Sequence, residues 1–141
     1  MTPGTNNERE RNRKSLTDEF NRSEFARLLG MVVMDTWEGG VRVRMDVTGK
    51  RNSRGNVHGG AIFSLADQAF GLAANLEDDQ VATSAHINYL SPAGDHLEAV
   101  AERVGGNALN TLYRVTVYEG ERVIATFEGV GIRMKRTARG K

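Results

Sequence analysis

The residues with the clearest chemical potential lie where the sequence predicts the start of a helix. Asn52 lies six positions before His58-Gly59-Gly60, and the chain then runs directly into an apolar stretch. The first N–H groups of a helix have no intrahelical partner, and the helix dipole adds positive potential there. Such an end polarises a carbonyl oxygen or binds an anion, as acyl transfer requires. Taken alone, the glycine pair also fits a simple helix entry, and His58 also fits a structural role.

A single carboxylate, Asp67, interrupts the apolar stretch. Its neighbours on the helix surface are Phe63, Ser64, Phe70 and Gly71, none of which carries positive charge. Burial of an unpaired carboxylate raises its pKa above the usual value of about 3.9, which makes it a better general base near neutral pH. The alternative is a structural Asp67 that is satisfied by a backbone amide or by the Ser64 hydroxyl.

The spacing of Gly59 and Asp67 constrains how they can act together. They are eight positions apart, which at about 1.5 Å per residue separates them by roughly 12 Å along a helix. One carbonyl group cannot contact both, because a donor and a base must each lie within about 3 Å of the reacting group or one water away. If both act in one site, a second chain supplies one of them. We therefore expect an isologous dimer with two such helices antiparallel across a two-fold axis.

Composition limits the classes of protein that remain. The 141 residues suit one domain, and the net charge of +1 gives no general attraction to nucleic acid or membranes. The absence of cysteine excludes disulfides, thiolate metal sites and cysteine nucleophiles. Together with a polar N-terminus that has no signal-peptide core, this predicts a cytoplasmic location. No run approaches the roughly 18 apolar residues of a membrane span.

The hydrophobic pattern divides the chain into three parts. Residues 1–19 are almost entirely polar and predict a flexible tail, residues 20–134 form the domain, and residues 135–141 form a basic tail. Within the domain, Ser23 and Gly30 bracket a short helix.

The domain contains one long helix among strands. Residues 59–76 are apolar around nearly the whole circumference, which predicts a helix buried on most sides. Residues 41–47 alternate with period two, as in a half-buried strand that forms a hairpin with the strand before it. The predicted strands are 31–37, 41–47, 82–90, 97–104, 109–118 and 122–134. This order predicts an α+β fold in which an antiparallel sheet wraps around the long helix.

Other motifs are missing or incomplete. The glycine cluster lacks the Lys-Ser/Thr of a P-loop, and there is no Gly-x-Ser-x-Gly elbow of a serine hydrolase. No ligand spacing joins His58, His86 and His96 into a zinc site. Aromatic residues are sparse and not interleaved with basic ones, which argues against single-stranded nucleic acid. The N-terminal tail is too short and polar for a helix-turn-helix.

The chain resembles the hotdog-fold thioesterases of the phenylacetic-acid-degradation type, relatives of 4-hydroxybenzoyl-CoA thioesterase, over residues 20–134. The matching segments are Leu28-Leu29-Gly30-Met31, Asn52-x-x-Gly55-x-x-His58-Gly59-Gly60, Asp67, Asn88-Tyr89-Leu90-x-Pro92 and Gly94-Asp95. The resemblance implies a hotdog fold, with a long central helix wrapped by a curved antiparallel sheet. It also implies dimers that usually pair into tetramers, and hydrolysis of acyl-CoA or aryl-CoA thioesters.

The resemblance also assigns the catalytic roles. It implies that Asp67 is the general base or the nucleophile, and that the N–H of Gly59 polarises the thioester carbonyl. It implies that His58 and Asn52 orient the thioester. No metal or redox cofactor is expected, and CoA enters only as part of the substrate.

Further residues are candidates for substrate binding. Gly60 is adjacent to the expected oxyanion site, and Thr83 is the nearest match to a hydroxyl that places water in related proteins. Arg51 and Arg54 could bind the phosphates of CoA, although exposed loop arginines are common.

Two alternatives share this fold. A hotdog protein that binds acyl-CoA without turnover has no use for an unpaired buried Asp67. A dehydratase or hydratase of the same fold usually places a different histidine and acid pair. Phe63, Phe70 and Tyr89 could line an acyl pocket, with core packing as the alternative.

Overall fold

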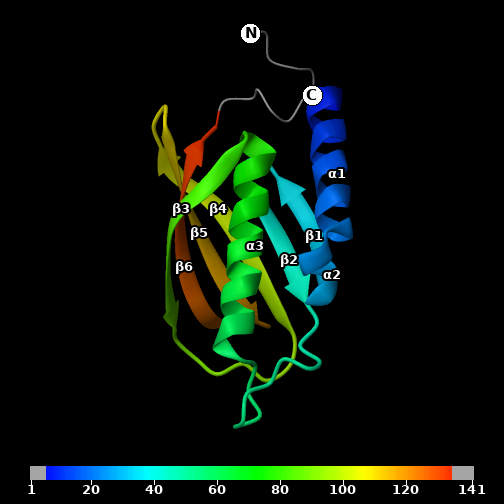
Figure 1. Cartoon of the computed structure of the whole chain (residues 1–141), viewed down its shortest axis with the longest axis vertical. Coiled ribbons are helices and arrows are strands. Elements are labelled where there is room, and N and C mark those ends of the chain that lie inside the picture. The colour runs from blue at the N-terminus through cyan, green and yellow to red at the C-terminus, as the bar shows by residue number, and fades with distance from the viewer. Residues whose placement is uncertain (1–5, 135–141) are drawn as a thin grey trace.

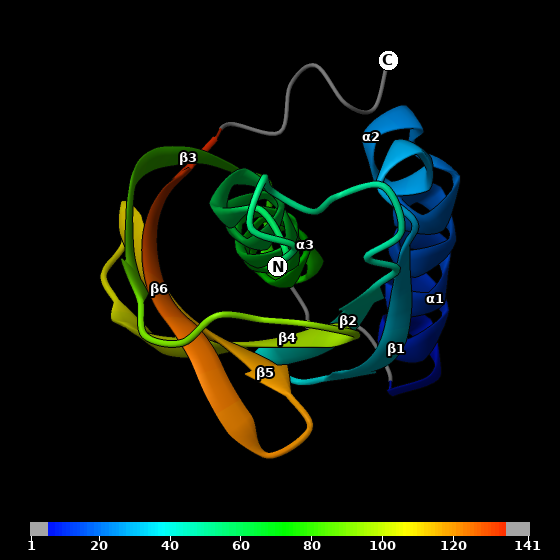
Figure 2. The same ribbon diagram turned by 90° about the horizontal axis from the view of Figure 1, so that it is seen from below.

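The computed structural model describes residues 6–134, and its centre is helix α3 (Gly59–Glu77). A six-stranded antiparallel sheet in the order β1-β2-β4-β5-β6-β3 curves around this helix (Figures 1 and 2). Its strands are β1 (Met31–Trp37), β2 (Gly40–Met45), β3 (Gln80–Tyr89), β4 (Leu97–Gly106), β5 (Asn110–Glu119) and β6 (Arg122–Arg133). Helices α1 (Asn6–Arg22) and α2 (Glu24–Leu28) precede the sheet. The predicted α+β architecture is confirmed.

The alternation in β2 decides which face of the sheet meets α3. Val41, Val43 and Met45 are fully buried, whereas Arg42 and Arg44 between them are exposed. Successive side chains of a strand point to opposite faces, so one register buries all three apolar groups together. The predicted hairpin of β1 and β2 is present.

Aromatic side chains join α3 to the far part of the sheet. The ring of Phe70 lies 5.9 Å from the ring centroids of both Tyr113 and Phe127. Gly129 of β6 makes room for this packing, because a Cβ there would lie only 2.7 Å from the Phe70 ring. These contacts hold one side of α3 firmly against β5 and β6.

The opposite side of α3 is uncovered within the single chain. Eight residues of the helix are buried, but one stripe is exposed or half-buried, so the prediction of burial around most of the circumference is too broad. The stripe, which we call the open face of α3, consists of Gly60, Ser64, Asp67, Gly71 and Asn75. Its members are three or four positions apart and therefore lie on one side of the helix.

Helix α1 corrects the prediction of a flexible tail over residues 1–19. It lies beside edge strand β1 and against α3, at the open side of the curved sheet (Figure 2). Phe20 packs against the hydrophobic core and Leu16, one turn before it, is half-buried. The backbone N–H of Val33 also donates to the Asn21 side chain, at 3.1 Å. Two apolar groups one turn apart thus hold an otherwise charged helix in place.

The expected basic tail, 135–141, and the first five residues of the expected N-terminal tail lie outside the described residues. Among the helices of residues 6–134, none has the length and apolar character needed to cross a membrane.

Candidate active site

His58 caps the start of α3. It has extended backbone angles, φ −62° and ψ 137°, and its Nδ1 accepts the backbone N–H of Gly60 at 2.8 Å. Because Nδ1 is the acceptor, Nε2 carries the proton of the neutral ring. A Cβ on Gly60 would lie 3.0 Å from Nδ1, so the absent side chain accommodates this cap. His58 and Gly60 therefore act as one structural unit at the helix start.

The N–H of Gly59 is the first-turn amide left open. The N–H groups of Ala61 and Ile62 donate to the His58 carbonyl, at 2.9 and 3.1 Å. Gly60 is satisfied by the cap, whereas Gly59 N–H has no hydrogen-bond partner among the described residues. One free donor at the positive end of a helix is thus available to a carbonyl oxygen or oxyanion.

Tyr89 secures this helix start from across the fold. Its hydroxyl donates to the Gly59 carbonyl at 3.0 Å, and its ring lies 3.4 Å from where a Gly59 Cβ would be. From the sequence, Tyr89 is a candidate only for an acyl pocket or the core, so this contact is not predicted. The available signal is its place in the shared Asn88-Tyr89-Leu90-x-Pro92 segment.

Asn52 shapes the loop before α3. Its side-chain oxygen accepts the backbone N–H groups of Arg54 and Asn56, at 3.0 and 3.1 Å. Its own N–H donates to the Asn56 carbonyl at 2.7 Å. The oxygen of Asn52 is therefore occupied by the loop, and only its amide NH2 is left for a substrate.

The two loop arginines differ in their freedom. Arg51 donates to the Gly55 carbonyl at 3.0 Å and lies 3.8 Å from a carboxylate oxygen of Asp95. The exposed side chain of Arg54 has no partner within residues 6–134. Arg54 is thus the arginine of this loop that is free to meet an anionic group.

Asp67 lies two turns further along α3, on the open face. Its carboxylate has no hydrogen-bond or ion-pair partner in the described part of the chain, and burial raises its pKa. The Ser64 hydroxyl donates to the Gly60 carbonyl at 2.8 Å instead, so it does not satisfy Asp67. Asp67 also lines a cavity of about 360 Å³ between α1, α3 and β3.

Thr83 lies neither at the start of α3 nor beside Asp67. It lies where the register of β3 shifts against β6, between Ala82 and Ser84, and its hydroxyl donates to the Val130 carbonyl at 3.2 Å. The structure thus brings His58, Gly59 and Gly60 together beside the Asn52 loop. Asp67 and Thr83 lie elsewhere in the same chain.

Phe63 and Phe70 take mainly core positions. Phe63 is half-buried, with its ring edge-on to Phe127 at 5.6 Å between centroids. Phe70 is almost completely buried, yet it also lines the cavity beside Asp67.

Comparison with known proteins agrees with this architecture. Residues 54–125 match the thioesterase superfamily. A protein of Deinococcus radiodurans, named provisionally as an esterase, is 41% identical over 119 residues, covering 79% of this chain and 80% of its own length. The acyl-coenzyme A thioesterase PaaI of Escherichia coli K12 is 35% identical over 121 residues, covering 82% of this chain and 86% of that protein.

A solved structure extends the similarity to most of the chain. The E. coli PaaI protein, from the phenylacetic acid degradation operon, superposes with a TM-score of 0.82 at 26% identity, covering 94% of this chain and 97% of that one. The chain therefore belongs to the thioesterase superfamily, with the hotdog fold of the PaaI type. This confirms the family resemblance.

Proposed function

We propose that this protein hydrolyses acyl-CoA or aryl-CoA thioesters to the free acid and CoA, in a site shared between two copies of the chain. The observation that carries the proposal is the presence of two unsatisfied groups on one helix. Gly59 offers a free N–H at the positive end of α3, and Asp67 offers an unpaired, half-buried carboxylate. The similarity to an acyl-CoA thioesterase supports the choice of substrate.

The proposed reaction has two stages and uses no metal or redox cofactor. The Gly59 N–H donates to the thioester oxygen, while the Asp67 carboxylate takes a proton from water as the water oxygen attacks the thioester carbon. An electron pair on the oxyanion of the tetrahedral intermediate then re-forms the C=O double bond. The C–S bond breaks, and Asp67 gives the proton that it took from water to the departing CoA thiolate. Direct attack by Asp67, with an anhydride intermediate that water then cleaves, would use the same two groups.

The roles of the remaining residues follow from their contacts. His58 holds the first turn of α3 through Gly60, and Asn52 holds the preceding loop, so both fix the direction of the Gly59 N–H. Arg54 is our candidate for the CoA phosphates, with Arg51 as its neighbour in the loop. In this assignment His58, Asn52 and Gly60 are positioning residues.

A shared site requires a partner on the open face of α3. When two copies of α3 run antiparallel about an axis near residue 63, position 59 of one lies level with position 67 of the other. Gly60 and Ser64 would then lie close to the axis, where small residues let two helices approach. This removes the separation of roughly 12 Å that exists within one chain.

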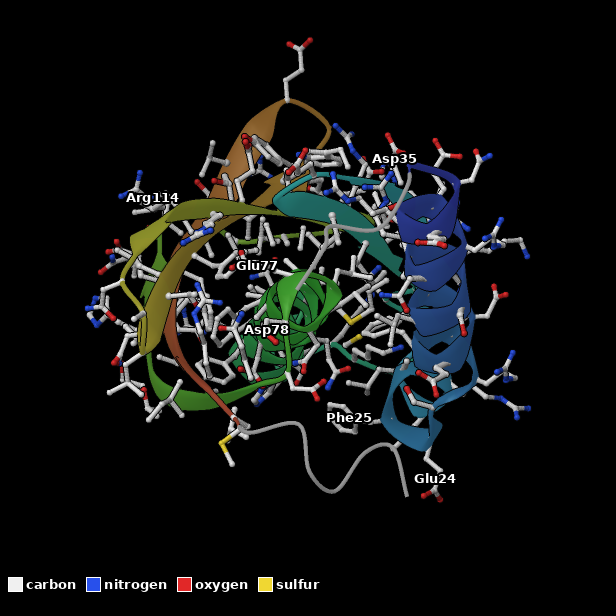
Figure 3. All side chains as sticks on the ribbon, turned by 90° about the horizontal axis from the view of Figure 1, so that it is seen from above. Glu24, Phe25, Asp35, Glu77, Asp78 and Arg114 are labelled. Carbon is white, nitrogen blue, oxygen red and sulfur yellow. The ribbon has the colours of Figure 1, made fainter. Side chains whose placement is uncertain are left out.

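Strand β3 supports a dimer contact beside that face. It ends the strand order, and eight of its ten residues are exposed. An uncovered edge strand is a template for pairing with another chain. Phe25, which is 45% exposed, projects from α2 toward the same open side of the molecule (Figure 3). We extend the proposal to pairing of dimers into tetramers, which the family resemblance implies, and to a cytoplasmic location, because the chain has no cysteine.

Thiol release from a panel of acyl-CoA and aryl-CoA thioesters tests the function. We expect hydrolysis by the wild type and a fall of about 10²–10⁴-fold in Asp67→Asn, which keeps the shape and removes the base. Asp46→Asn is the matched control. The Asp46 carboxylate hydrogen-bonds Thr48 on a loop outside the cavity, so its loss should change the rate by less than about twofold.

The pH profile gives an independent readout. Because burial raises the pKa of Asp67, the acid limb of kcat/KM should lie at a higher pH than the usual pKa of an aspartate. The same limb should be absent from the residual activity of Asp67→Asn. Equal rates for Asp67→Asn and the wild type would make Asp67 structural. Binding of CoA esters without turnover by either protein would favour the non-catalytic alternative.

A further inference from the structure

The cavity beside Asp67 is partly open to solvent, and the elements that line it are distant in the sequence. Its volume of about 360 Å³ lies within the range of small-molecule sites. The walls come from α1, the open face of α3, the start of β3 and one residue of β6. Asp67 and Asn75 both line this cavity, and they are eight residues apart on the same helix. The cavity therefore extends about 12 Å along α3.

The walls of the cavity are mainly apolar. The apolar side chains that line it include Leu16 and Phe20 of α1, Phe70 and Leu72 of α3, and Val81 of β3. An apolar group of a ligand would therefore leave water for carbon surfaces on several sides. This character matches a hydrocarbon or aryl chain better than the polar CoA moiety.

The polar side chains at the far end are already engaged. The backbone N–H of Gln80 donates to the Asn75 side-chain oxygen at 3.1 Å, and the Asn75 amide donates to the Gly71 carbonyl at 2.9 Å. The Gln80 side chain donates to the Ala74 carbonyl at 2.9 Å and accepts from the Thr111 hydroxyl. With its donors and acceptors committed internally, this end of the cavity offers little to a polar tail.

Gly71 keeps the middle of the cavity open. It lines the cavity four residues after Asp67 and four before Asn75, and a Cβ built on it would meet nothing within 4 Å. The position is about 6 Å from Asp67 along the helix, which is the length of roughly four carbon atoms. A side chain at position 71 would therefore divide the cavity near its midpoint.

We propose that this cavity receives the acyl group of the thioester, that it selects apolar acyl groups, and that Gly71 determines how long an acyl chain fits. Helix α1 forms the outer wall through Leu16 and Phe20, so the segment before residue 20 contributes to specificity. The inference rests on the proposed function, because Asp67 defines the reacting end of the cavity.

Substitution at Gly71 tests the length limit. In Gly71→Leu, the ratio of kcat/KM for octanoyl-CoA to kcat/KM for acetyl-CoA should fall by at least about tenfold relative to the wild type. Each methylene that loses its apolar surroundings is worth about fourfold. Gly71→Ala should show the same trend more weakly and should be the more stable protein, because alanine favours a helix interior.

Gly105→Leu is the matched control. A Cβ on Gly105 also meets nothing within 4 Å, but this residue lies on β4 and does not line the cavity. It should leave the ratio of octanoyl to acetyl activity unchanged. Phe20→Ala tests the α1 wall from the other direction, and should raise the relative rate for bulky aryl thioesters.

Binding of non-hydrolysable S-alkyl-CoA thioethers separates the two proposals. Affinity should rise with alkyl length in the wild type and level off near four carbons in Gly71→Leu, as measured by calorimetry. Thioester hydrolysis with a chain-length profile unchanged by Gly71→Leu would overturn the pocket and leave the function. Length-dependent thioether binding that responds to Gly71→Leu, without any hydrolysis, would overturn the function and leave the pocket. An equal loss for every acyl length would also refute the role of Gly71.

Discussion

The backbone N–H of Gly59 can be removed by mutation with little change to the fold. Gly59 is the first residue of α3, where proline is well tolerated because this N–H has no intrahelical partner. His58, at φ −62° and ψ 137°, already has the extended conformation required before proline. Gly59→Pro should therefore fold, with its cap intact and its amide donor gone. Gly59→Ala is the matched variant, since it adds a Cβ and keeps the donor.

The expected loss follows from the hydrogen bonds of the first turn. Removing one oxyanion donor lowers kcat by about 10²–10³-fold, or roughly 2.7–4 kcal/mol of transition-state stabilisation. The N–H of Gly60 is held by His58 Nδ1, and that of Ala61 by the His58 carbonyl, so neither can replace the lost donor. We therefore expect Gly59→Pro to lie near the upper end of this range. Gly59→Ala should stay within about tenfold of the wild type, because its Cβ would lie 3.4 Å from the Tyr89 ring, an ordinary contact.

Co-expression of Gly59→Pro with Asp67→Asn, at equal levels, tests whether the site is shared. In a mixed dimer one site joins the intact Gly59 of one chain to the intact Asp67 of the other, while the second site carries both defects. Random pairing makes about half of the dimers mixed, so total activity should recover to about one quarter of the wild type. Thiol release per protein chain measures this recovery, with size and mass analysis showing that the mixture is oligomeric.

Two outcomes would contradict a shared site in which Gly59 is the donor. If the mixed preparation is no more active than its parents although mixed dimers are present, each chain uses its own residues or the assigned residues are wrong. If Gly59→Pro is folded and as active as Gly59→Ala, the Gly59 N–H is not the donor. Thermal unfolding of both variants distinguishes a chemical defect from a folding defect.

Two stability predictions concern the scaffold. Hydrogen bonds, first from the Asp95 backbone N–H, lower the pKa of Glu119 below its usual value of 4.5 in the folded protein. Their stabilisation is therefore present above that value and lost as the pH falls through the lower folded pKa. Glu119→Gln should cost about 1 kcal/mol in urea unfolding at neutral pH, and a gap that does not shrink on acidification would contradict this assignment. Gly129→Ala should lower stability by about 1–3 kcal/mol, because its Cβ would lie 2.7 Å from the buried Phe70 ring. Gly105→Ala, which meets open space, is its control, and equal melting temperatures would contradict the packing argument.

The parts of the fold that could be predicted are those with a local hydrophobic period. Alternation at Val41, Val43 and Met45 identifies β2 and its buried face, and the apolar run after Gly59 identifies α3. In both cases the pattern itself carries the information, since each side chain's environment follows from the geometry of its own element. What α3 leaves uncovered could not be predicted, because this depends on where the two edges of the sheet stop.

Helix α1 shows where composition misleads. Its sequence is dominated by charged and polar groups, so average polarity predicts a tail. The signal for a helix consists of only two apolar residues, Leu16 and Phe20, at a spacing of four. This spacing places both on one face, but an isolated helix with so little apolar surface is marginal. Its stability depends on the contact with α3 and β1, which no local pattern reveals.

The candidate site divides in the same way. The unpaired state of Asp67 could be predicted from its neighbours along the helix, and the structure agrees because the hydroxyl three positions before it, on Ser64, donates to the backbone. The roles of Asn52 and Arg51 could not, because short polar loops often satisfy side chains with their own backbone. The contact of Tyr89 with Gly59 could not be predicted for another reason. It contacts Gly59 from a strand thirty positions away, and only the completed sheet brings the two together.

The cost of an unpaired Asp67 is itself an argument about function. An ionised carboxylate with a raised pKa is less favourable in the folded chain than in water, so its ionisation lowers the stability of the fold. Among the described residues, no fully buried side-chain N or O atom lacks a hydrogen-bond partner. Asp67 is half-buried at a cavity wall without such a partner, and we attribute this to a requirement outside the stability of the single chain. A thioester bound against a second subunit meets that requirement, since it needs a base that no neighbouring cation or donor has already neutralised.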